Sequence, residues 1–386
     1  MSFTLALPQI SLSGEGAISD AIKTIAQQGV RSVLLLTDEI LVKLDAAKLV
    51  KDALTEAGIG YTIFSAIEPN PTVATVTAAF AAFTSAKPDA LVALGGGSVI
   101  DTAKAVRLLS ANPGPIQAYE GVHHELRKGA TLVAIATTSG TAAEVTSNAV
   151  ITDTERHVKM VIITHASIPD IAVNDPAALK SMPRGTTAAT GMDALTHAIE
   201  AYVSVGAHTV TDHSALESIR VISQWLPVAY DDGANLEART MMAHGSFLAG
   251  MAFNSAGLGA VHSLAHQPGA THNLPHGVCN AILLPVVENY NRPAAVERFA
   301  RVAEAMGVNI AGMSAEEASV AAIDAIRKLS KRVGIPASLG ELGVQKSAIE
   351  AWIQPAINDP CTPGNPRKID ADVVRALYNE ALQAAQ

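Results

Sequence analysis

The histidine-rich run at residues 257–277 has the clearest potential for chemistry, because it holds four of the twelve histidines of the chain. His262 and His266 are four residues apart, so a helix would place both imidazoles on one face. His276 follows Pro268, where we expect that helix to break and the chain to fold back. Two imidazoles from one helical face and a third from a turn are typical of a metal site.

The neighbours of these histidines argue against a simpler alternative, in which the imidazoles lie on a polar surface helix. Leu258, Val261, Leu264 and Ala265 are all apolar, so we expect this helix to be buried. Buried imidazoles need polar partners. The sequence therefore favours a metal site over a surface cluster.

Asp193 and His197 form a second pair, also four residues apart on a predicted helix. By themselves they could be a structural carboxylate–imidazole pair. With His262 and His276 they make one carboxylate and three imidazoles, a set that suits a borderline divalent ion such as Fe²⁺, Zn²⁺, Co²⁺ or Ni²⁺. His266 is not needed to complete this set, and we interpret it as a proton shuttle beside the metal.

A glycine-rich segment, Gly95-Gly-Gly-Ser98, stands between a predicted strand and a predicted helix. Its glycines let the backbone approach a ligand closely, and the helix N-terminus offers N–H groups to a phosphate; Asp101 could cap those groups instead. A tight structural turn is an equal alternative for this segment alone. A second polar loop, Thr137-Thr-Ser-Gly-Thr141, follows the next strand, and two such loops at strand ends favour a nucleotide or pyrophosphate site.

Two charged residues are further candidates for cofactor contacts. Asp38 follows an apolar strand at residues 32–37, where an acid can accept hydrogen bonds from a ribose diol; a helix cap is an equal alternative. Lys159 lies in a predicted hairpin formed by residues 149–152 and 158–163. Its ammonium group could reach a phosphate, although a solvated lysine is the stronger alternative.

The elements that must position these residues change character near Pro183. Before it, short β-rich runs alternate with helical patterns; after it, strand signals vanish and long helical patterns follow one another. We therefore predict two domains. Residues 1–182 form an open, mostly parallel α/β domain that binds a dinucleotide, and residues 183–386 form an all-helical, metal-binding catalytic domain.

Composition limits the class of partner. The net charge of -9 argues against a nucleic acid or an anionic membrane surface. The start of the chain lacks the basic segment and long apolar core of a signal peptide, and no stretch is apolar enough to span a bilayer. The two cysteines provide no disulfide framework, so we expect a cytoplasmic protein.

Taken together, these motifs resemble the iron-containing, or group III, alcohol dehydrogenase family, including bacterial enzymes that act on ethanol, propanediol and methanol. The resemblance extends over almost the whole chain. It rests on the segments Gly95-Gly-Gly-Ser-Val-Ile-Asp-Thr-Ala-Lys104, Thr137-Thr-Ser-Gly-Thr-Ala-Ala-Glu144, Ala189-Thr-Gly-Met-Asp-Ala-Leu-Thr-His-Ala-Ile-Glu200, Gly259-Ala-Val-His-Ser-Leu-Ala-His266 and Asn273-Leu-Pro-His-Gly-Val-Cys-Asn280.

The resemblance implies a dehydroquinate synthase-like fold and a reversible reaction in which a short primary alcohol or diol and NAD⁺ give an aldehyde and NADH. It implies a homodimer or a larger homo-oligomer. It assigns the metal, iron(II) with zinc as the alternative, to Asp193, His197, His262 and His276, and places His266 beside it. The cofactor positions it matches are Gly97, Ser98, Thr138, Thr141, Lys159 and Asp38, of which Asp38 is the acid that favours NAD over NADP. We further predict cofactor contacts for Asn70, Gly96, Asp101 and Thr137.

The same resemblance places Asn148, Phe253 and Cys361 in the substrate pocket. Some positions depart from the family pattern: Pro268 and His272 stand where some relatives carry leucine and an aromatic residue. These departures affect the expected substrate size and not the chemistry. A polyol dehydrogenase of the glycerol type, a dehydroquinate-synthase-like lyase and a non-catalytic NAD- or metal-binding protein are the alternatives.

Overall fold

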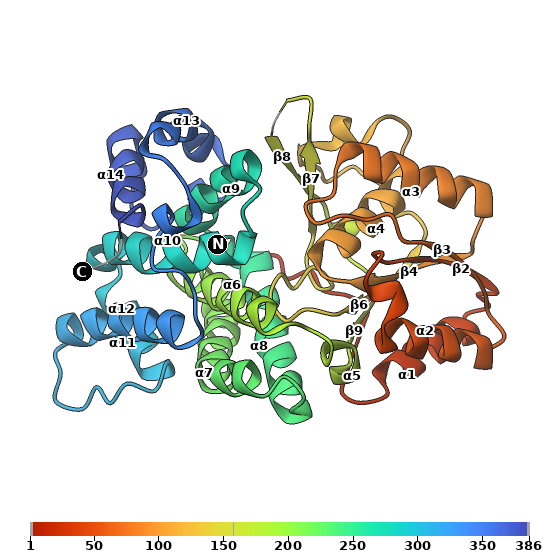
Figure 1. Cartoon of the computed structure of the whole chain (residues 1–386), viewed down its shortest axis with the longest axis horizontal. Helices are drawn as coiled ribbons and strands as arrows, with labels where there is room; N and C mark the ends of the chain where they lie inside the picture. The colour runs from red at the N-terminus through yellow and green to blue at the C-terminus, as the bar shows by residue number, and fades with distance from the viewer. Residues whose placement is uncertain (1–2, 157, 384–386) are drawn as a thin grey trace. The chain divides into compact units, whose positions relative to one another are not determined.

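The computed structural model describes residues 3–156 and 158–383, so the outermost residues of both predicted domains lie outside the described part. The chain forms two compact units, which divide between Met182 and Pro183 (Figure 1). Residues 3–5 group with the second unit and not, as predicted, with the first. The Phe3 ring stacks on His208 with 3.7 Å between centroids, which ties this short segment to the helical unit.

The first unit is built on a six-stranded sheet in which every neighbouring pair is parallel, as predicted. The strand order is β1-β9-β6-β4-β2-β3. The edge strand β1 was not predicted from the sequence. The strands are β1 (Ile10–Ser13), β2 (Ser32–Leu36), β3 (Gly60–Phe64), β4 (Ala90–Gly95), β6 (Thr131–Ala136) and β9 (Ile171–Asn174).

Helices cover both faces of this sheet, which explains why its central strands are apolar without interruption. In β2, Val33 and Leu35 pack into one core with α1 (Ala17–Gln27) and α2 (Asp45–Glu56). Leu34 and Leu36 point to the other face, toward α3 (Val73–Ala86) and α4 (Gly97–Leu109). Successive strand residues face opposite sides, so one apolar run supplies two cores.

A small second sheet completes this unit. The strands β7 (Asn148–Asp153) and β8 (Val158–Ile163) pair antiparallel, which confirms the predicted hairpin, and β5 (Gly121–Val122) adds to β8. Short helices connect the larger elements along the whole chain. They are α5 (Pro176–Leu179) and the 3₁₀ helices η1 (Leu41–Lys43), η2 (Ile116–Tyr119), η3 (His165–Ser167), η4 (Arg292–Ala294), η5 (Gly340–Leu342), η6 (Lys346–Ala348) and η7 (Thr362–Gly364).

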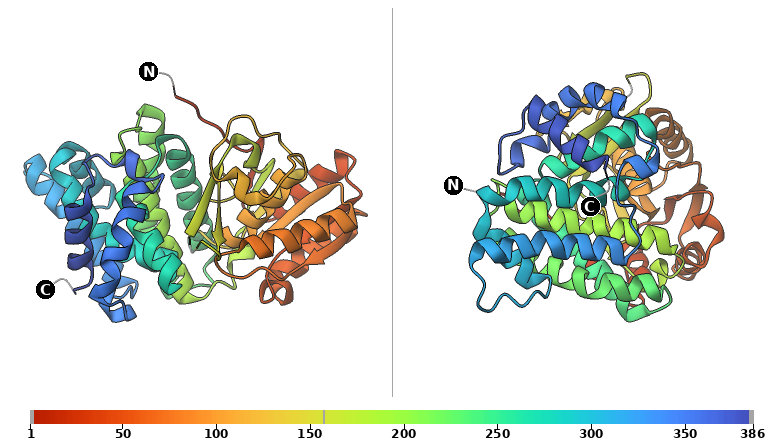
Figure 2. Two further views of the ribbon diagram at one scale, coloured as in Figure 1. Left: turned by 90° about the horizontal axis from the view of Figure 1, so that it is seen from above. Right: turned by 60° about the vertical axis from the view of Figure 1, so that its left-hand side comes forward.

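The second unit is helical, and no strand occurs between residues 183 and 383. Every residue of α6 from Gly191 to Val203 is buried, because α7, α8 and α10 pack around this helix (Figures 1 and 2). The helices are α6 (Arg184–Val203), α7 (Thr209–Asp231), α8 (Leu236–Ala256), α9 (Ala260–His272), α10 (His276–Asn291), α11 (Val296–Ala305), α12 (Ala315–Arg332), α13 (Ile349–Asn358) and α14 (Ala371–Ala381). In the part of the chain described, no helix has the length and apolar character that crossing a membrane requires.

Helix α9 does not break at Pro268, contrary to our expectation, but continues to His272. Proline has no N–H to donate to the carbonyl of the residue four positions earlier, which here is Leu264. The Tyr378 hydroxyl of α14 donates to that carbonyl at 2.7 Å and replaces the missing bond. The helix ends where Asn273 takes a left-handed backbone (φ 51°), so the chain turns only there before His276 begins α10.

Candidate metal centre and dinucleotide-binding loops

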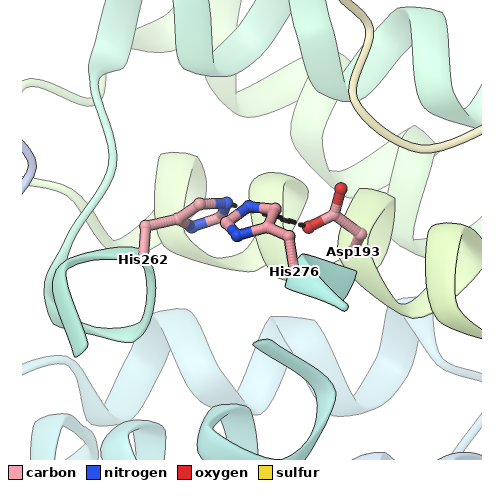
Figure 3. A group of neighbouring side chains, drawn as sticks. All are labelled: Asp193, His262 and His276. Carbon is pink, nitrogen blue, oxygen red and sulfur yellow. Dashed lines mark ion pairs between the residues drawn. The ribbon is translucent and has the colours of Figure 1, made fainter. Parts of the chain in front are cut away.

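Three potential ligands from three helices meet in the second unit. Asp193 of α6, His262 of α9 and His276 of α10 each direct one ligand atom to a common region, and these atoms all lie within 4.8 Å of one another (Figure 3). Asp193 Oδ1 is 3.6 Å from His276 Nε2 and 3.9 Å from His262 Nε2. The carboxylate and one imidazole are buried, and His276 is partly exposed. This arrangement has the ligand types and spacing of a divalent metal site.

Asn280, one helical turn after His276, shows how closely the three groups converge. Its side-chain nitrogen is 2.6 Å from Asp193 Oδ1, 3.1 Å from His262 Nε2 and 3.0 Å from His276 Nε2. The electron pairs of all three groups therefore face one point beside the Asn280 amide. A bound cation requires this convergence, so the residues fit a metal.

A buried carboxylate orients one of these imidazoles. Glu200, on the same helix as Asp193, forms a hydrogen bond with His262 Nδ1 and accepts the Val261 N–H at 2.7 Å through its other oxygen. Burial raises the pKa of Glu200 and lowers the pKa of His262, so burial disfavours a charge on either member of this hydrogen-bonded pair. The Val261 N–H favours the ionised form of Glu200, and a neutral imidazole that donates from Nδ1 to that carboxylate has its electron pair on Nε2, toward the cluster.

The fourth predicted ligand, His197, lies against this cluster without joining it. Its ring stacks between His262 and Phe253, with centroid distances of 4.5 Å and 4.3 Å. The group of mutually close ligand atoms consists of Asp193, His262 and His276 among the described residues. Ligation by His197 therefore stays a prediction. Phe253, predicted to line the substrate pocket, packs on the face of a predicted ligand.

His266 contacts the rings of both His262 and His276. Its ring is nearly parallel to that of His276, with 5.4 Å between centroids, and its Nδ1 is 2.7 Å from a carboxylate oxygen of Asp359. The backbone N–H of Cys361, another predicted pocket residue, donates to the second oxygen of Asp359 at 2.9 Å. Asn148, the third predicted pocket residue, begins β7 in the first unit.

The predicted cofactor loops meet at one edge of the parallel sheet. β4 and β6 are neighbouring parallel strands, so the loops after them emerge side by side, and Thr137 donates its N–H to the Gly95 carbonyl at 3.0 Å. A Cβ atom at Gly96 would lie 3.1 Å from Thr138 Cγ2, and one at Gly97 would lie 3.0 Å from Thr141 Cγ2. A side chain at either glycine would push against these threonine side chains, so glycine suits the close contact between the loops, and the first turn of α4 opens beside it.

Three further predicted cofactor residues, from separate segments, are linked by hydrogen bonds. Asn70 lies in the loop before α3 with a left-handed backbone (φ 56°). Its N–H donates to Ser98 Oγ at 3.3 Å, and its side-chain oxygen accepts from Lys159 Nζ at 2.8 Å. The structure thus brings the hairpin lysine to the start of α4, where a phosphate would bind. Binding of a dinucleotide by these residues stays a prediction.

Asp38 acts as a turn cap in this structure. Its Oδ1 accepts the N–H groups of Ile40 at 2.9 Å and Leu41 at 2.7 Å. This is one of the two roles that the sequence left open. A contact between the other oxygen and a ribose stays a prediction.

The predicted capping role of Asp101 is wrong. The first turn of α4 contains no acidic residue, and its N-cap, Gly96, has no side-chain cap. Asp101 Oδ2 instead accepts the Val150 N–H at 3.0 Å, and Oδ1 lies 3.8 Å from Lys104 Nζ. The side chain points back toward β7 because it is too far along the helix to reach the free N–H groups at its start.

Sequence reasoning missed Glu200, Asn280 and Asp359. The sequence could have indicated two of them, because each shares a helix face with a predicted ligand. Glu200 follows Asp193 by seven residues, and Asn280 follows His276 by four. Asp359 offers no such signal, because it follows α13 and meets α9 only through the tertiary fold.

Comparison with known proteins places this geometry in a family. The family model "Iron-containing alcohol dehydrogenase" matches residues 8–176, and "Fe-containing alcohol dehydrogenase family, C-terminal" matches residues 187–382. A solved structure of a 1,3-propanediol oxidoreductase has a TM-score of 0.97 and 41% identity, and the match covers 99% of this chain and 100% of that one.

Two curated relatives are similar over nearly their full length. The NAD-dependent methanol dehydrogenase of Bacillus methanolicus is 41% identical, with 97% of this chain and 99% of the relative covered. The 1,3-propanediol dehydrogenase of Klebsiella pneumoniae is 42% identical, with 98% and 99% covered. These matches span both units, and the chain therefore belongs to the iron-containing alcohol dehydrogenase family of NAD-dependent oxidoreductases, which interconvert alcohols and aldehydes with iron or another divalent metal.

Proposed function

We propose that this enzyme interconverts a short primary alcohol or diol and its aldehyde, with NAD as the working cofactor and Asp193, His197, His262 and His276 as the metal ligands. The convergence of three ligand atoms within 4.8 Å carries this proposal. The names of the relatives, which refer to methanol and 1,3-propanediol, support a substrate of a few carbon atoms.

The metal and NAD would supply part of the reaction chemistry, and side chains of the protein would supply the rest. A divalent ion at this site would act as a Lewis acid toward the alcohol oxygen, and NAD would accept the hydride. The chain supplies the neutral imidazole that such an ion requires, because burial keeps the pKa of His262 near 4. His266, beside the cluster, would take up the proton that the alcohol releases.

The dinucleotide would bind where the loops after β4 and β6 meet in the first unit. The N–H groups at the start of α4 and the Lys159 ammonium suit its pyrophosphate, and Asp38 suits the adenosine ribose. A 2′-phosphate beside Asp38 would place two negative charges close together, which favours NAD over NADP.

The proposal includes a cytoplasmic location and a homodimer or larger homo-oligomer. No disulfide links the two cysteines, which suits a reducing compartment. Members of the family are usually dimers. Sedimentation of the purified protein at several concentrations would measure the size of the assembly.

The experiment that tests the function combines metal analysis with an activity panel. We expect about one divalent ion per chain, and NADH-dependent reduction of short aldehydes that exceeds NADPH-dependent reduction. His262→Ala and Asp193→Ala should lose both the metal and the activity, whereas His213→Ala, an exposed histidine of α7, should keep both. The panel includes glycerol and dihydroxyacetone, so a preference for polyols would redirect the proposal. Full activity in a chelated, metal-free sample would overturn it.

A further inference from the structure

The buried carboxylate of Asp359 is not among the residues that the proposed reaction uses. Its side chain is only 8% exposed, although it follows the end of α13. One oxygen lies 2.7 Å from His266 Nδ1, and the other accepts the Cys361 N–H at 2.9 Å. Both oxygens are therefore held, one by the proposed proton shuttle and one by the backbone of its own loop.

These contacts determine the charge of Asp359. Burial alone would raise its pKa, but the hydrogen bonds from His266 and Cys361 act in the opposite direction, and the pKa of Asp359 lies below its ordinary value. The group is thus an ionised carboxylate at neutral pH, and an ionised carboxylate can only accept hydrogen bonds.

The contact with His266 has a directional consequence. If Asp359 only accepts, Nδ1 of His266 must carry the hydrogen in their bond, and the electron pair of the neutral imidazole is then on Nε2. The ring is also held flat against His276, with an interplanar angle of 17°. A carboxylate on one edge and a parallel ring on one face leave the imidazole little freedom to rotate.

We propose that Asp359 is a positioning residue for His266: it fixes the ring beside the cluster of Asp193, His262 and His276 in the Nδ1–H form, so that Nε2 accepts the proton released from the alcohol. The same bond prevents Nδ1 from turning toward the cluster as an additional ligand. This inference rests on the proposed function, because it assigns a partner to the proposed proton shuttle.

Replacement by asparagine is a sharp test, since Asp359→Asn keeps the shape and replaces one acceptor oxygen with a donor. The amide N–H would select the opposite imidazole form, with the hydrogen on Nε2. We expect kcat to fall on the order of a hundredfold, the scale of a lost acid–base step, with little change in KM and with the metal retained. Asp370→Asn is the matched control, because Asp370 caps α14 and asparagine caps helices equally well.

A double-mutant cycle separates positioning from a general structural effect. If Asp359 acts through His266, adding Asp359→Asn to His266→Ala should lower kcat no further than His266→Ala alone. An equal loss in both backgrounds would overturn the inference. Loss of the metal in His266→Ala would also overturn it, because His266 would then be a ligand.

A spectroscopic measurement on the unmodified chain keeps the test independent of folding in the variants. In zinc-loaded protein with ¹⁵N-labelled histidine, the nitrogen shifts of His266 should show a protonated Nδ1 and an unprotonated Nε2. The reverse pattern would overturn the inference. A parent enzyme that binds no metal or reduces no aldehyde refutes the proposed function instead, whereas an active parent with a fully active Asp359→Asn variant refutes only the role of Asp359.

Discussion

At the scale of single residues, the buried carboxyl group of Glu200 forms hydrogen bonds with both the backbone and a candidate ligand of α9. One oxygen receives the backbone N–H of Val261 in the first turn of α9, and the other bonds to the imidazole of His262 in the same turn. Gly259 permits this approach, because a Cβ atom there would lie 3.1 Å from Glu200 Oε1. The start of α9 and the orientation of a candidate ligand therefore depend on the same group.

We predict that Glu200→Gln weakens metal binding by roughly tenfold to a hundredfold, the usual effect of losing the carboxylate partner of a ligating histidine. The dissociation constant for Zn²⁺, measured in competition with a chelator, checks this. Glu144→Gln is the matched control, since Glu144 is similarly buried and accepts a hydrogen bond from Asn174, not from a ligand. Equal affinities in Glu200→Gln and the parent would contradict the prediction.

The two roles of Asp38 can be separated by a pair of substitutions. Asp38→Gly should shift the ratio of kcat/KM for NADH and NADPH toward NADPH by tens- to hundreds-fold, because a close like-charge contact costs on the order of a few kcal/mol. Asp38→Asn removes the charge but keeps the oxygen that caps Ile40 and Leu41, so it should shift the ratio with less loss of stability. If the ratio is unchanged in both variants, Asp38 is only a turn cap.

At the scale of elements, the site depends on how closely α10 approaches α6. A Cβ atom at Gly277, immediately after His276, would lie 2.3 Å from the backbone carbonyl oxygen of Ala189. Neither backbone can yield easily at this contact. The absence of a side chain at Gly277 therefore allows the first turn of α10 to present His276 to Asp193.

We predict that Gly277→Ala lowers both the metal content and the melting temperature, because the helices must separate by enough to displace His276. Overpacking of this kind costs about 1–3 kcal/mol. Gly185→Ala, in the first turn of α6, is the matched control, since nothing lies within 4 Å of its added Cβ atom. Metal analysis and thermal unfolding of both variants check the prediction, and a fully loaded Gly277→Ala variant would refute it.

At the scale of the whole molecule, the candidate ligands and the cofactor loops belong to different units. A ligand stabilises the elements that hold it, by about 2.7 kcal/mol at a concentration one hundred times its dissociation constant. Chelation should therefore increase hydrogen exchange in α6, α9 and α10 and leave β4 and β6 of the six-stranded sheet unchanged. NAD added to the metal-free protein should protect the loops after β4 and β6. A uniform increase throughout the chain on chelation would contradict this division.

The sequence by itself determined the elements and most of the candidate residues. Apolar runs and helical spacings are local properties, so they predicted the parallel sheet, the helical unit and the shared face of His262 and His266. Loops after parallel strands emerge at one edge, so the meeting of the Gly95–Ser98 and Thr137–Thr141 segments also followed. β1 was missed although its four residues, Ile10–Ser13, alternate between apolar and polar, because so short an alternation is a weak signal of a strand.

Only the tertiary structure decided the partners of these side chains. Glu200 meets His262 across 62 positions of sequence, and Asp359 meets His266 across 93. The spacing of residues within one helix determines which face of that helix a side chain lies on. The packing of other elements against that face determines which residues the side chain contacts. Tertiary contacts also gave Asp101 a partner in β7, and the Tyr378 hydroxyl bonds to the Leu264 carbonyl where α9 continues past Pro268.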